Sequence, residues 1–233
     1  MIWLGIETAN APLSIALVQD GKILAEIVQH LKITHSAGAM PAIEELCAKV
    51  SIQPTAIDAI AVSEGPGAYT GVRIGVTLAK TLAWTMQKPL VGVSSLQVLA
   101  TNGRLFNGIV CPLFDARRQH VYAALYRGQT SEVLLEDGHY SIESLFEQVK
   151  KYKESVLFIG EDVAFYKEQI EQALGKQAIF APFTLHLPRA SELVALAMEM
   201  ELPDISATHS FVPKYRRIAE AEANWLKEQK ESK

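Results

Sequence analysis

The order of the expected strands and helices limits the fold more than any other feature of this sequence. Alternating apolar residues predict strands and helical stripes predict helices in the first part of the chain. The expected elements are strands over 2–7, 12–18 and 22–28, a helix over 35–50, a strand over 57–63, a helix over 71–86 and a strand over 90–93. Strands joined by tight turns pair antiparallel, and strands joined through a helix pair in parallel. This part of the chain therefore predicts a mixed five-stranded sheet flanked by helices.

The rest of the chain partly repeats this order. Strands are expected over 109–115, 120–127, 133–137, 156–159 and 178–180, and helices over 142–152, 163–174, 189–200 and 218–229. Turn-forming residues at 101–104 predict a first lobe over 1–103 and a second over 104–216, and we expect residues 217–233 to form a C-terminal helix packed near the first lobe. Two such α/β lobes, each like ribonuclease H, are the organisation of the actin-like ATPase superfamily.

Composition and charge exclude several classes of protein. The 233 residues are 49% hydrophobic and 21% charged, which is typical of a chain with a sizeable core. A net charge of −4 lacks the basic footprint of a domain that holds nucleic acid alone. No basic residue precedes Lys22, and two basic residues interrupt the apolar stretch at 72–86, so neither a signal peptide nor a membrane span is expected. Cys47 and Cys111 lack ligand spacing, which indicates reduced thiols in the cytoplasm.

A glycine-rich loop joins a strand to a helix at residues 63–75. Its glycines permit positive φ angles and turn backbone N–H groups toward a helix start, which favours an anion. Missing side chains equally permit a tight turn with close helix packing, and the sequence leaves both readings open. A Walker loop is excluded because no Gly-Lys-Ser/Thr follows. The candidate nucleotide or anion ligands are Gly65, Gly67, Thr70 and Gly71, with Arg117 from a later turn.

Several segments together carry a family resemblance. They are Gly5-Ile6-Glu7-Thr8-Ala9, His35-Ser36, the string from Gly65 to Gly75, Asp115-Ala116-Arg117-Arg118 and Pro213-Lys214-Tyr215-Arg216-Arg217. In this order, over the whole chain, they resemble the bacterial TsaB family, also called YeaZ. The resemblance implies a cytoplasmic subunit of the machinery that installs threonylcarbamoyladenosine beside the anticodon of tRNAs that read codons beginning with A.

The resemblance also implies partners and cofactors. In this family TsaC-type proteins make threonylcarbamoyl-adenylate, and TsaD transfers the group to tRNA. The TsaB-family protein is the obligatory partner of TsaD, and the ATPase TsaE joins them. We expect ATP and a metal in the assembled complex and no cofactor held by this chain itself. We expect tRNA contact only through the complex, and no membrane partner.

Residues that carry chemistry elsewhere in the superfamily differ here. TsaD-like sequences place two metal-binding histidines four residues apart on a helix, and Ser95 and Leu99 stand at those positions. Glu7 stands where TsaB sequences usually have Asp and where related kinases hold hydrated magnesium, and no glycine follows it in the expected hairpin. The six histidines are scattered, and no nucleophile motif is present. We therefore expect no catalytic residue and no metal site.

Two helices are expected to meet a partner. The helix at 71–86 is apolar or small around nearly its whole circumference, and the helix at 35–50 carries several small residues, which implies a second buried face. The expected docking residues are His35, Ala39, Met40, Ile43, Leu46, Val72, Arg73, Val76, Ala79 and Lys80. The same surface could join two copies of this chain. Alternatively, both helices pack only against each other and the sheet, and His35 is a helix-start residue capped by a neighbouring hydroxyl.

Two basic clusters leave their roles open. Arg117 and Arg118 predict either a solvated hairpin or a ligand site. The cluster at 214–217 surrounds Tyr215 and predicts either a contact to tRNA or nucleotide, or a charged entry to a helix. Two functions compete with the scaffold that the resemblance implies. They are a small-molecule or carboxylate kinase of the same fold, and a self-associating binding module unrelated to tRNA.

Overall fold

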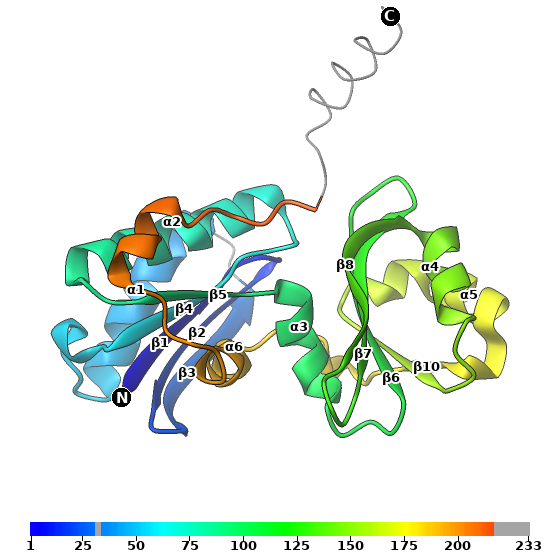
Figure 1. The fold of residues 1–233 in the computed structure, drawn as a ribbon, viewed down its shortest axis with the longest axis horizontal. Coiled ribbons are helices and arrows are strands. Elements are labelled where there is room, and N and C mark those ends of the chain that lie inside the picture. The colour runs from blue at the N-terminus through cyan, green and yellow to red at the C-terminus, as the bar shows by residue number, and fades with distance from the viewer. Residues whose placement is uncertain (31–33, 217–233) are drawn as a thin grey trace, which may run out of the picture.

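The structure, a computed structural model, describes residues 1–30 and 34–216. It contains two lobes side by side, each built on a five-stranded mixed sheet (Figure 1). The first sheet has the order β3-β2-β1-β4-β5 and the second the order β10-β9-β6-β7-β8. In each sheet the first three strands in the chain pair antiparallel and the last two add in parallel. This arrangement confirms the two mixed sheets that the element order predicts.

The first lobe consists of a three-stranded antiparallel meander followed by two crossover connections. Its elements are β1 (Ile2–Glu7), β2 (Pro12–Gln19), β3 (Lys22–His30), α1 (His35–Lys49), β4 (Ala59–Ser63), α2 (Tyr69–Met86) and β5 (Leu90–Val93). Asp20 and Gly21 both have positive φ, as a two-residue hairpin turn requires. Apolar faces of α1 and α2 cover one side of this sheet and form the largest cluster of buried residues in the described chain.

The second lobe repeats the pattern with shorter helices. Its elements are β6 (Ile109–Asp115), β7 (His120–Arg127), β8 (Val133–Ser141), α4 (Ile142–Val149), β9 (Val156–Ile159), α5 (Val163–Leu174) and β10 (Ala178–Phe180). The Ser141 side chain accepts a hydrogen bond from the N–H of Ser144 at 3.1 Å and caps α4. Strand β8 runs farther than the expected 133–137 because Ser141 still pairs with His120 of β7.

Two helices cross between the lobes. Helix α3 (Ser95–Ala100) directly follows the first sheet, yet Leu96 and Leu99 pack on the second. Helix α6 (Ala190–Met198) follows the second sheet, yet it packs on the first. Figure 1 shows α3 between the two sheets and α6 beside the strands of the first sheet. Lobe membership therefore does not follow chain order, because each lobe closes its second face with a helix from the other part of the chain.

The last described segment also returns to the first lobe. We call residues 205–216 the C-terminal strap; it includes the 3-10 helix η5 (Ile205–Ser210), which packs against α2. The expected C-terminal helix at 217–233 lies outside the described residues. Within the described ranges, no helix is long and apolar enough to cross a membrane.

Candidate functional site

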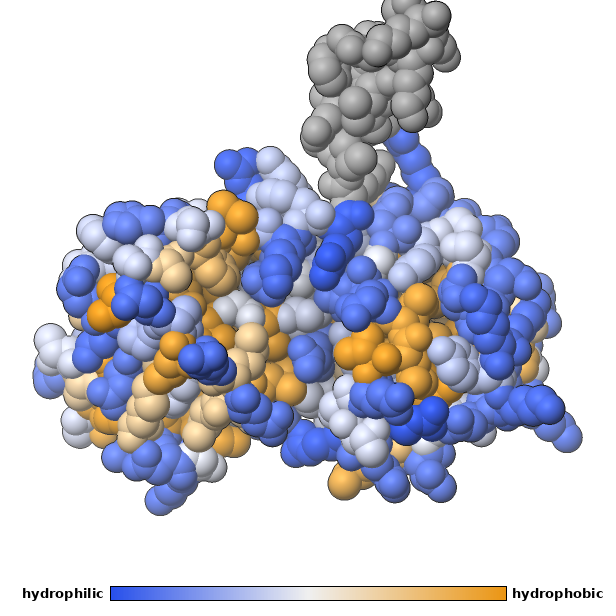
Figure 2. Space-filling view, in the orientation of Figure 1, coloured by the Kyte–Doolittle hydropathy of each residue, from blue (hydrophilic) through white to orange (hydrophobic). Residues whose placement is uncertain are grey.

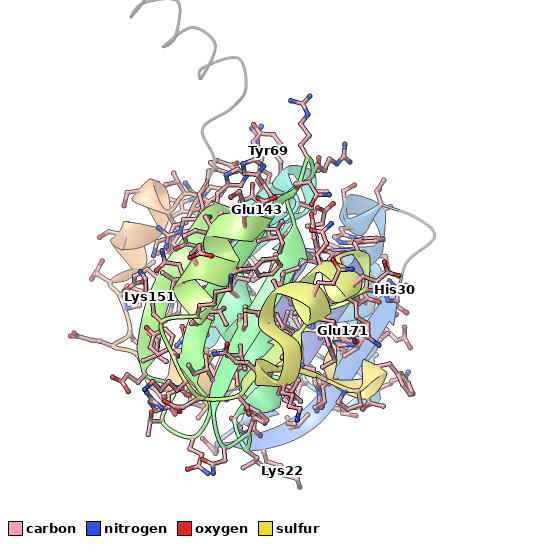
Figure 3. The ribbon with its side chains drawn as sticks, turned by 90° about the vertical axis from the view of Figure 1, so that its right-hand side faces the viewer. Lys22, His30, Tyr69, Glu143, Lys151 and Glu171 are labelled. Atoms are coloured by element: carbon pink, nitrogen blue, oxygen red, sulfur yellow. The ribbon has the colours of Figure 1, made fainter. Side chains whose placement is uncertain are left out.

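A cleft of about 1120 Å³ separates the two lobes. Its walls come from the β1–β2 turn, the glycine-rich loop, the β6–β7 turn, the segment after β9 and the end of the strap. Polar residues gather at the upper junction of the lobes on the face that Figure 2 shows. Tyr69 lies at that upper end, and Lys22, the first residue of β3, lies at the opposite end (Figure 3). The cleft thus opens at the edge where the parallel strands end, a frequent position for ligands in α/β folds.

The glycines of the loop serve close packing with the β1–β2 turn. A Cβ on Gly67 would lie 2.3 Å from the carbonyl oxygen of Ala9, and a Cβ on Gly71 would lie 2.2 Å from that of Thr8. The N–H of Ala68 donates to the Ala9 carbonyl at 2.7 Å. The Thr8 hydroxyl donates to the carbonyl of Gly71 at 2.9 Å. These contacts support the close-packing reading of the loop, because side chains are missing where backbone touches backbone.

The candidate anion ligands are only partly brought together. Gly67, Thr70 and Arg117 line the cleft. Gly65 is buried and faces the strap, where an added Cβ would lie 2.7 Å from the carbonyl oxygen of Lys214. Gly71 is buried against Thr8. A ligand in the cleft would therefore meet Gly67, Thr70 and Arg117, and not the other two glycines.

Glu7 is completely buried at the end of β1. Its Oε1 accepts a hydrogen bond from the N–H of Ala9 at 2.8 Å. Burial raises the pKa of Glu7 to about 7, although the hydrogen bond from the Ala9 N–H opposes the shift. A magnesium ion in a protein usually keeps several water ligands, so the carboxylates that bind it must be reached by water. The surroundings of Glu7 do not fit such an ion.

Ser95 and Leu99, the two residues that the sequence analysis compared with metal ligands, make structural contacts. The Ser95 hydroxyl oxygen accepts a hydrogen bond from the N–H of Gly65 at 3.2 Å, and the Ser95 N–H donates to the Gly65 carbonyl at 3.0 Å. Leu99 is fully buried in the core beneath the second sheet. Among the residues that the structure describes, no group of three or more His, Cys, Asp or Glu side chains could hold a metal ion. The donor set at α3 does not fit a divalent metal.

The β6–β7 turn presents basic residues in an unusual backbone conformation. Arg117, Arg118 and Gln119 all have positive φ angles, between 54° and 65°. Consecutive side-chain-bearing residues rarely adopt this region. Asp115 stabilises the turn, since its Oδ1 accepts hydrogen bonds from the Arg117 N–H at 2.9 Å and the Tyr166 hydroxyl at 2.6 Å. Sequence patterns gave no sign of this conformation, and it directs the turn along the cleft wall that Arg117 lines.

Charges of both signs line the cleft. The basic residues are Arg117, Lys214 and Arg216, and the acidic residues are Asp115, Glu161 and Asp162. Burial raises the pKa of Asp162, and the hydrogen bond that its Oδ2 accepts from the Asp115 N–H opposes this shift. Burial lowers the pKa of His186, whose Nδ1 accepts a hydrogen bond from the Gly160 N–H at 3.1 Å. The cleft therefore combines an apolar lining with charged side chains of both signs in equal number.

Comparison with known proteins identifies relatives over the whole chain. Residues 22–225 match the family model described as TsaD, tRNA N6-adenosine threonylcarbamoyltransferase. The chain is 44% identical to the tRNA threonylcarbamoyladenosine biosynthesis protein TsaB of Bacillus subtilis, over 99% of this chain and 100% of that protein. The chain belongs to the TsaB family.

Solved structures agree on the fold. YeaZ from Pseudomonas aeruginosa is 24% identical, covers 92% of this chain and 99% of its own, and superposes with a TM-score of 0.72. The ethanolamine utilization protein EutJ from Carboxydothermus hydrogenoformans is 13% identical over 83% of this chain and 89% of its own, with a TM-score of 0.53. This TsaB-family chain therefore shares its two-lobed fold with YeaZ and with EutJ.

The docking residues expected for this TsaB-family chain fall into two groups. Six are buried in the core of the first lobe with exposed fractions of 5% or less: Ala39, Ile43, Leu46, Val72, Val76 and Ala79. Arg73 is exposed, and His35, Met40 and Lys80 are partly exposed. Residues of the first group have no surface to offer a partner, because their stripe faces the sheet. The helical period located the buried face correctly, but it assigned that face to a partner.

His35 and Lys80 have partners within the chain. The Nε2 atom of His35 lies 2.7 Å from the Asn10 carbonyl oxygen, so this side chain ties the start of α1 to the β1–β2 turn. Thr34 precedes the helix without a side-chain cap hydrogen bond. The Lys80 ammonium donates to the carbonyls of His209 and Phe211 at 2.7 and 3.1 Å. Part of the second buried face expected on α2 is therefore covered by the strap, which sequence patterns did not reveal.

The basic residues of the cluster at 214–217 form ion pairs with different parts of the molecule. The ammonium of Lys214 lies 2.6 Å from the Glu64 carboxylate, and the guanidinium of Arg216 lies 3.9 Å from that of Asp137 in the second lobe. Tyr215 stacks on Tyr69. Arg217 lies outside the described residues. The described members thus bring the strap into contact with both lobes and with the cleft.

Proposed function

We propose that this chain is a non-catalytic scaffold that pairs with TsaD in the biosynthesis of threonylcarbamoyladenosine in tRNA. TsaE joins the pair, and a TsaC-type enzyme supplies the threonylcarbamoyl-adenylate. The proposal places the complex in the cytoplasm, with tRNA bound through the assembly. Membership of the TsaB family supports the biosynthetic role, since the Bacillus subtilis relative is named for it.

The packing at the end of β1 carries the non-catalytic part of the proposal. The Glu7 carboxylate is fully buried and bonded to its own turn, so it faces no substrate. Gly67 and Gly71 touch the backbone of that turn, which occupies the space where a phosphate-binding loop would need open N–H groups. Ser95 and Leu99 supply structure in place of metal ligands. ATP and a metal in this proposal belong to the assembled TsaD-containing complex.

The outer sides of α1 and α2 are the proposed surface for TsaD. The two helices contact each other on one face of the first sheet. Met40 of α1 and Ile74 of α2 are partly exposed, and Thr77 is exposed beside them on the helix surface. Small and apolar residues on two neighbouring helices permit close approach of two further helices. A second copy of this chain would use the same surface when TsaD is absent.

A nucleotide-dependent kinase is the alternative that the cleft favours. Its volume of about 1120 Å³ is sufficient for a nucleotide, and Gly67, Thr70 and Arg117 line it. A kinase would bind Mg-ATP and turn it over without TsaD. A scaffold would leave turnover to the assembled complex. A binding module unrelated to tRNA would neither hydrolyse ATP nor change the yield of modified tRNA.

Reconstitution tests the proposal. Purified TsaC-type enzyme, TsaD and TsaE are supplied with ATP, threonine, bicarbonate and tRNA, with and without this chain. We expect product only with the chain present, and equal rescue by Ser95→Ala, which removes the acceptor for the Gly65 N–H without touching a reacting group. Undiminished product without the chain would refute the scaffold. Turnover of ATP by the chain alone would favour the kinase.

A further inference from the structure

Two tyrosine rings stack at the edge of the interlobe cleft. Tyr69 begins α2, and Tyr215 lies on the strap. Their ring centres are 5.2 Å apart, and the ring planes meet at 29°. Tyr69 is 58% exposed and Tyr215 is 48% exposed, and both line the cleft. A stacked pair with this much ring surface in water is available to a ligand that also stacks.

An arginine without a carboxylate partner accompanies the rings. The Arg73 guanidinium carbon lies 5.1 Å from the centre of the Tyr69 ring, and Nη1 donates to the Tyr69 hydroxyl at 2.7 Å. In the described part of the chain, Arg73 forms no ion pair. Lys214 and Arg216 flank Tyr215 in sequence and pair with Glu64 and Asp137. The charge at the ring pair is therefore positive, with Arg73 as its uncompensated member.

Rings beside cations are the chemistry that binds single-stranded nucleic acid. An unpaired base stacks on an aromatic face, and a cation meets the neighbouring phosphate. An acidic peptide would use the arginine but has no planar group to match both rings. A duplex keeps its bases stacked on each other, so it offers none to the tyrosines. Single-stranded RNA is the ligand class that uses all three side chains.

We propose that Tyr69, Tyr215 and Arg73 form a stacking site for an unpaired base of RNA. The inference rests on the proposed function, which makes tRNA the RNA that the assembled complex handles. Because its net charge is −4, the chain lacks the overall electrostatic attraction to phosphates of a complete RNA-binding domain. It supplies one local contact to RNA. The adjoining cleft has room for a base that has left its stacked position in an RNA loop.

Photo-cross-linking locates the site. The full chain is mixed at low salt with a single-stranded RNA that carries one 4-thiouridine. The RNA has about ten nucleotides, which is longer than the contact of one stacking platform. The mixture is irradiated, and the cross-linked residues are mapped by mass spectrometry. We expect cross-links at Tyr69 or Tyr215. Cross-links confined to other segments, or none at protein concentrations that saturate binding, would overturn the proposal.

Binding of the same RNA, followed by fluorescence anisotropy, tests the roles of the side chains. We expect the single strand to bind more tightly than a duplex of equal length. The double variant Tyr69→Leu with Tyr215→Leu should bind the single strand about tenfold more weakly. Tyr69→Phe keeps the ring and should bind within about twofold of the unaltered chain. The matched control is Phe165→Leu, because Phe165 is 72% exposed on α5 in the second lobe. Equal binding by the double variant, or preference for the duplex, would contradict the proposal.

Reconstituted tRNA modification separates this inference from the proposed function. We expect the double variant to pair with TsaD and to raise the KM for tRNA while kcat stays unchanged. If omission of the whole chain leaves product unchanged, the proposed function fails while the cross-links still test the stacking site. If omission abolishes product and the double variant keeps the original KM and RNA affinity, the stacking site fails and the scaffold stands.

Discussion

Lys214 is held to Glu64 twice. Its ammonium lies 2.6 Å from the Glu64 carboxylate, and its backbone N–H donates to the Glu64 carbonyl at 2.7 Å. The Glu64 side chain is only 9% exposed, and it lies at the start of the glycine-rich loop. A residue near the end of the described chain thus secures the segment that forms one wall of the cleft.

Removing the Lys214 ammonium should destabilise the protein. Lys214→Met leaves a nearly buried carboxylate without its cation, and we expect a loss of about 1–2 kcal/mol in the free energy of unfolding by urea. Lys167→Met is the matched control, because Lys167 and Glu171 form an exposed pair at 3.9 Å. That control should change stability by less than about 0.5 kcal/mol. Equal losses of unfolding free energy in both variants would show that the Lys214 ammonium stabilises the protein no more than the ammonium of an exposed ion pair does.

The packing of α2 against Thr8 predicts an unusual response to alanine. Alanine normally stabilises a helix position by about 1 kcal/mol relative to glycine. Gly71→Ala should instead destabilise by roughly 3 kcal/mol, because its Cβ would lie 2.2 Å from the Thr8 carbonyl oxygen. Gly21→Ala meets no atom within 4 Å and should cost only about 1–2 kcal/mol from its positive φ. A neutral or stabilising Gly71→Ala, measured by urea denaturation, would disprove the close contact.

Burial of Glu7 makes stability depend on pH. Its pKa rises from 4.5 to about 7 on folding, so the folded state binds more protons than the unfolded state between these values. The stabilisation is complete below about pH 4.5 and is lost as pH rises to about 7. Relative to Glu7→Gln, the unaltered chain should lose roughly 3 kcal/mol of unfolding free energy between pH 4.5 and 8.

The Glu7→Gln comparison separates this carboxyl from all others. Both proteins share every other titrating group, so the difference between their urea midpoints at each pH reports Glu7 alone. Parallel pH profiles would mean that Glu7 ionises in the folded protein as it does in the unfolded chain.

Local patterns predicted the sheets well because each strand carries its own signal. Ile2–Glu7 and Ile109–Asp115 are short apolar runs between turn residues, and both form central strands of their sheets. Asp20-Gly21 specifies its hairpin by backbone preference alone. These signals need no knowledge of the rest of the fold.

Features set by distant contacts escaped prediction. Nothing in the sequence of α3 or α6 shows that each packs on the sheet of the other lobe. The strap has no regular strand or α-helix, so its course along α2 depends on contacts such as Lys80 with His209. Periodicity identifies a buried stripe but not what buries it, so for Ile43 and Val76 it does not distinguish the sheet from a partner.

The two faces of α1 and α2 should respond in opposite ways to an added charge. Ile43→Glu with Val76→Glu places unpaired carboxylates in the core, and we expect loss of the folded state, at about 3 kcal/mol or more for each site. Met40→Glu with Ile74→Glu changes partly exposed positions on the same helices, so the lobe should stay folded. Pairing with TsaD should nevertheless fall below detection in size-exclusion chromatography, because the charges would be desolvated in an apolar interface.

A charge on the other lobe controls for a general effect on association. Phe165→Glu changes a 72% exposed residue on α5, and we expect it to fold and to pair with TsaD as the unaltered chain does. Circular dichroism of all three variants separates unfolding from lost pairing. If the Met40→Glu and Ile74→Glu protein is folded and still elutes with TsaD, the docking surface is not the outer side of α1 and α2. Loss of pairing in that protein alone would place the surface at the partly exposed positions of α1 and α2.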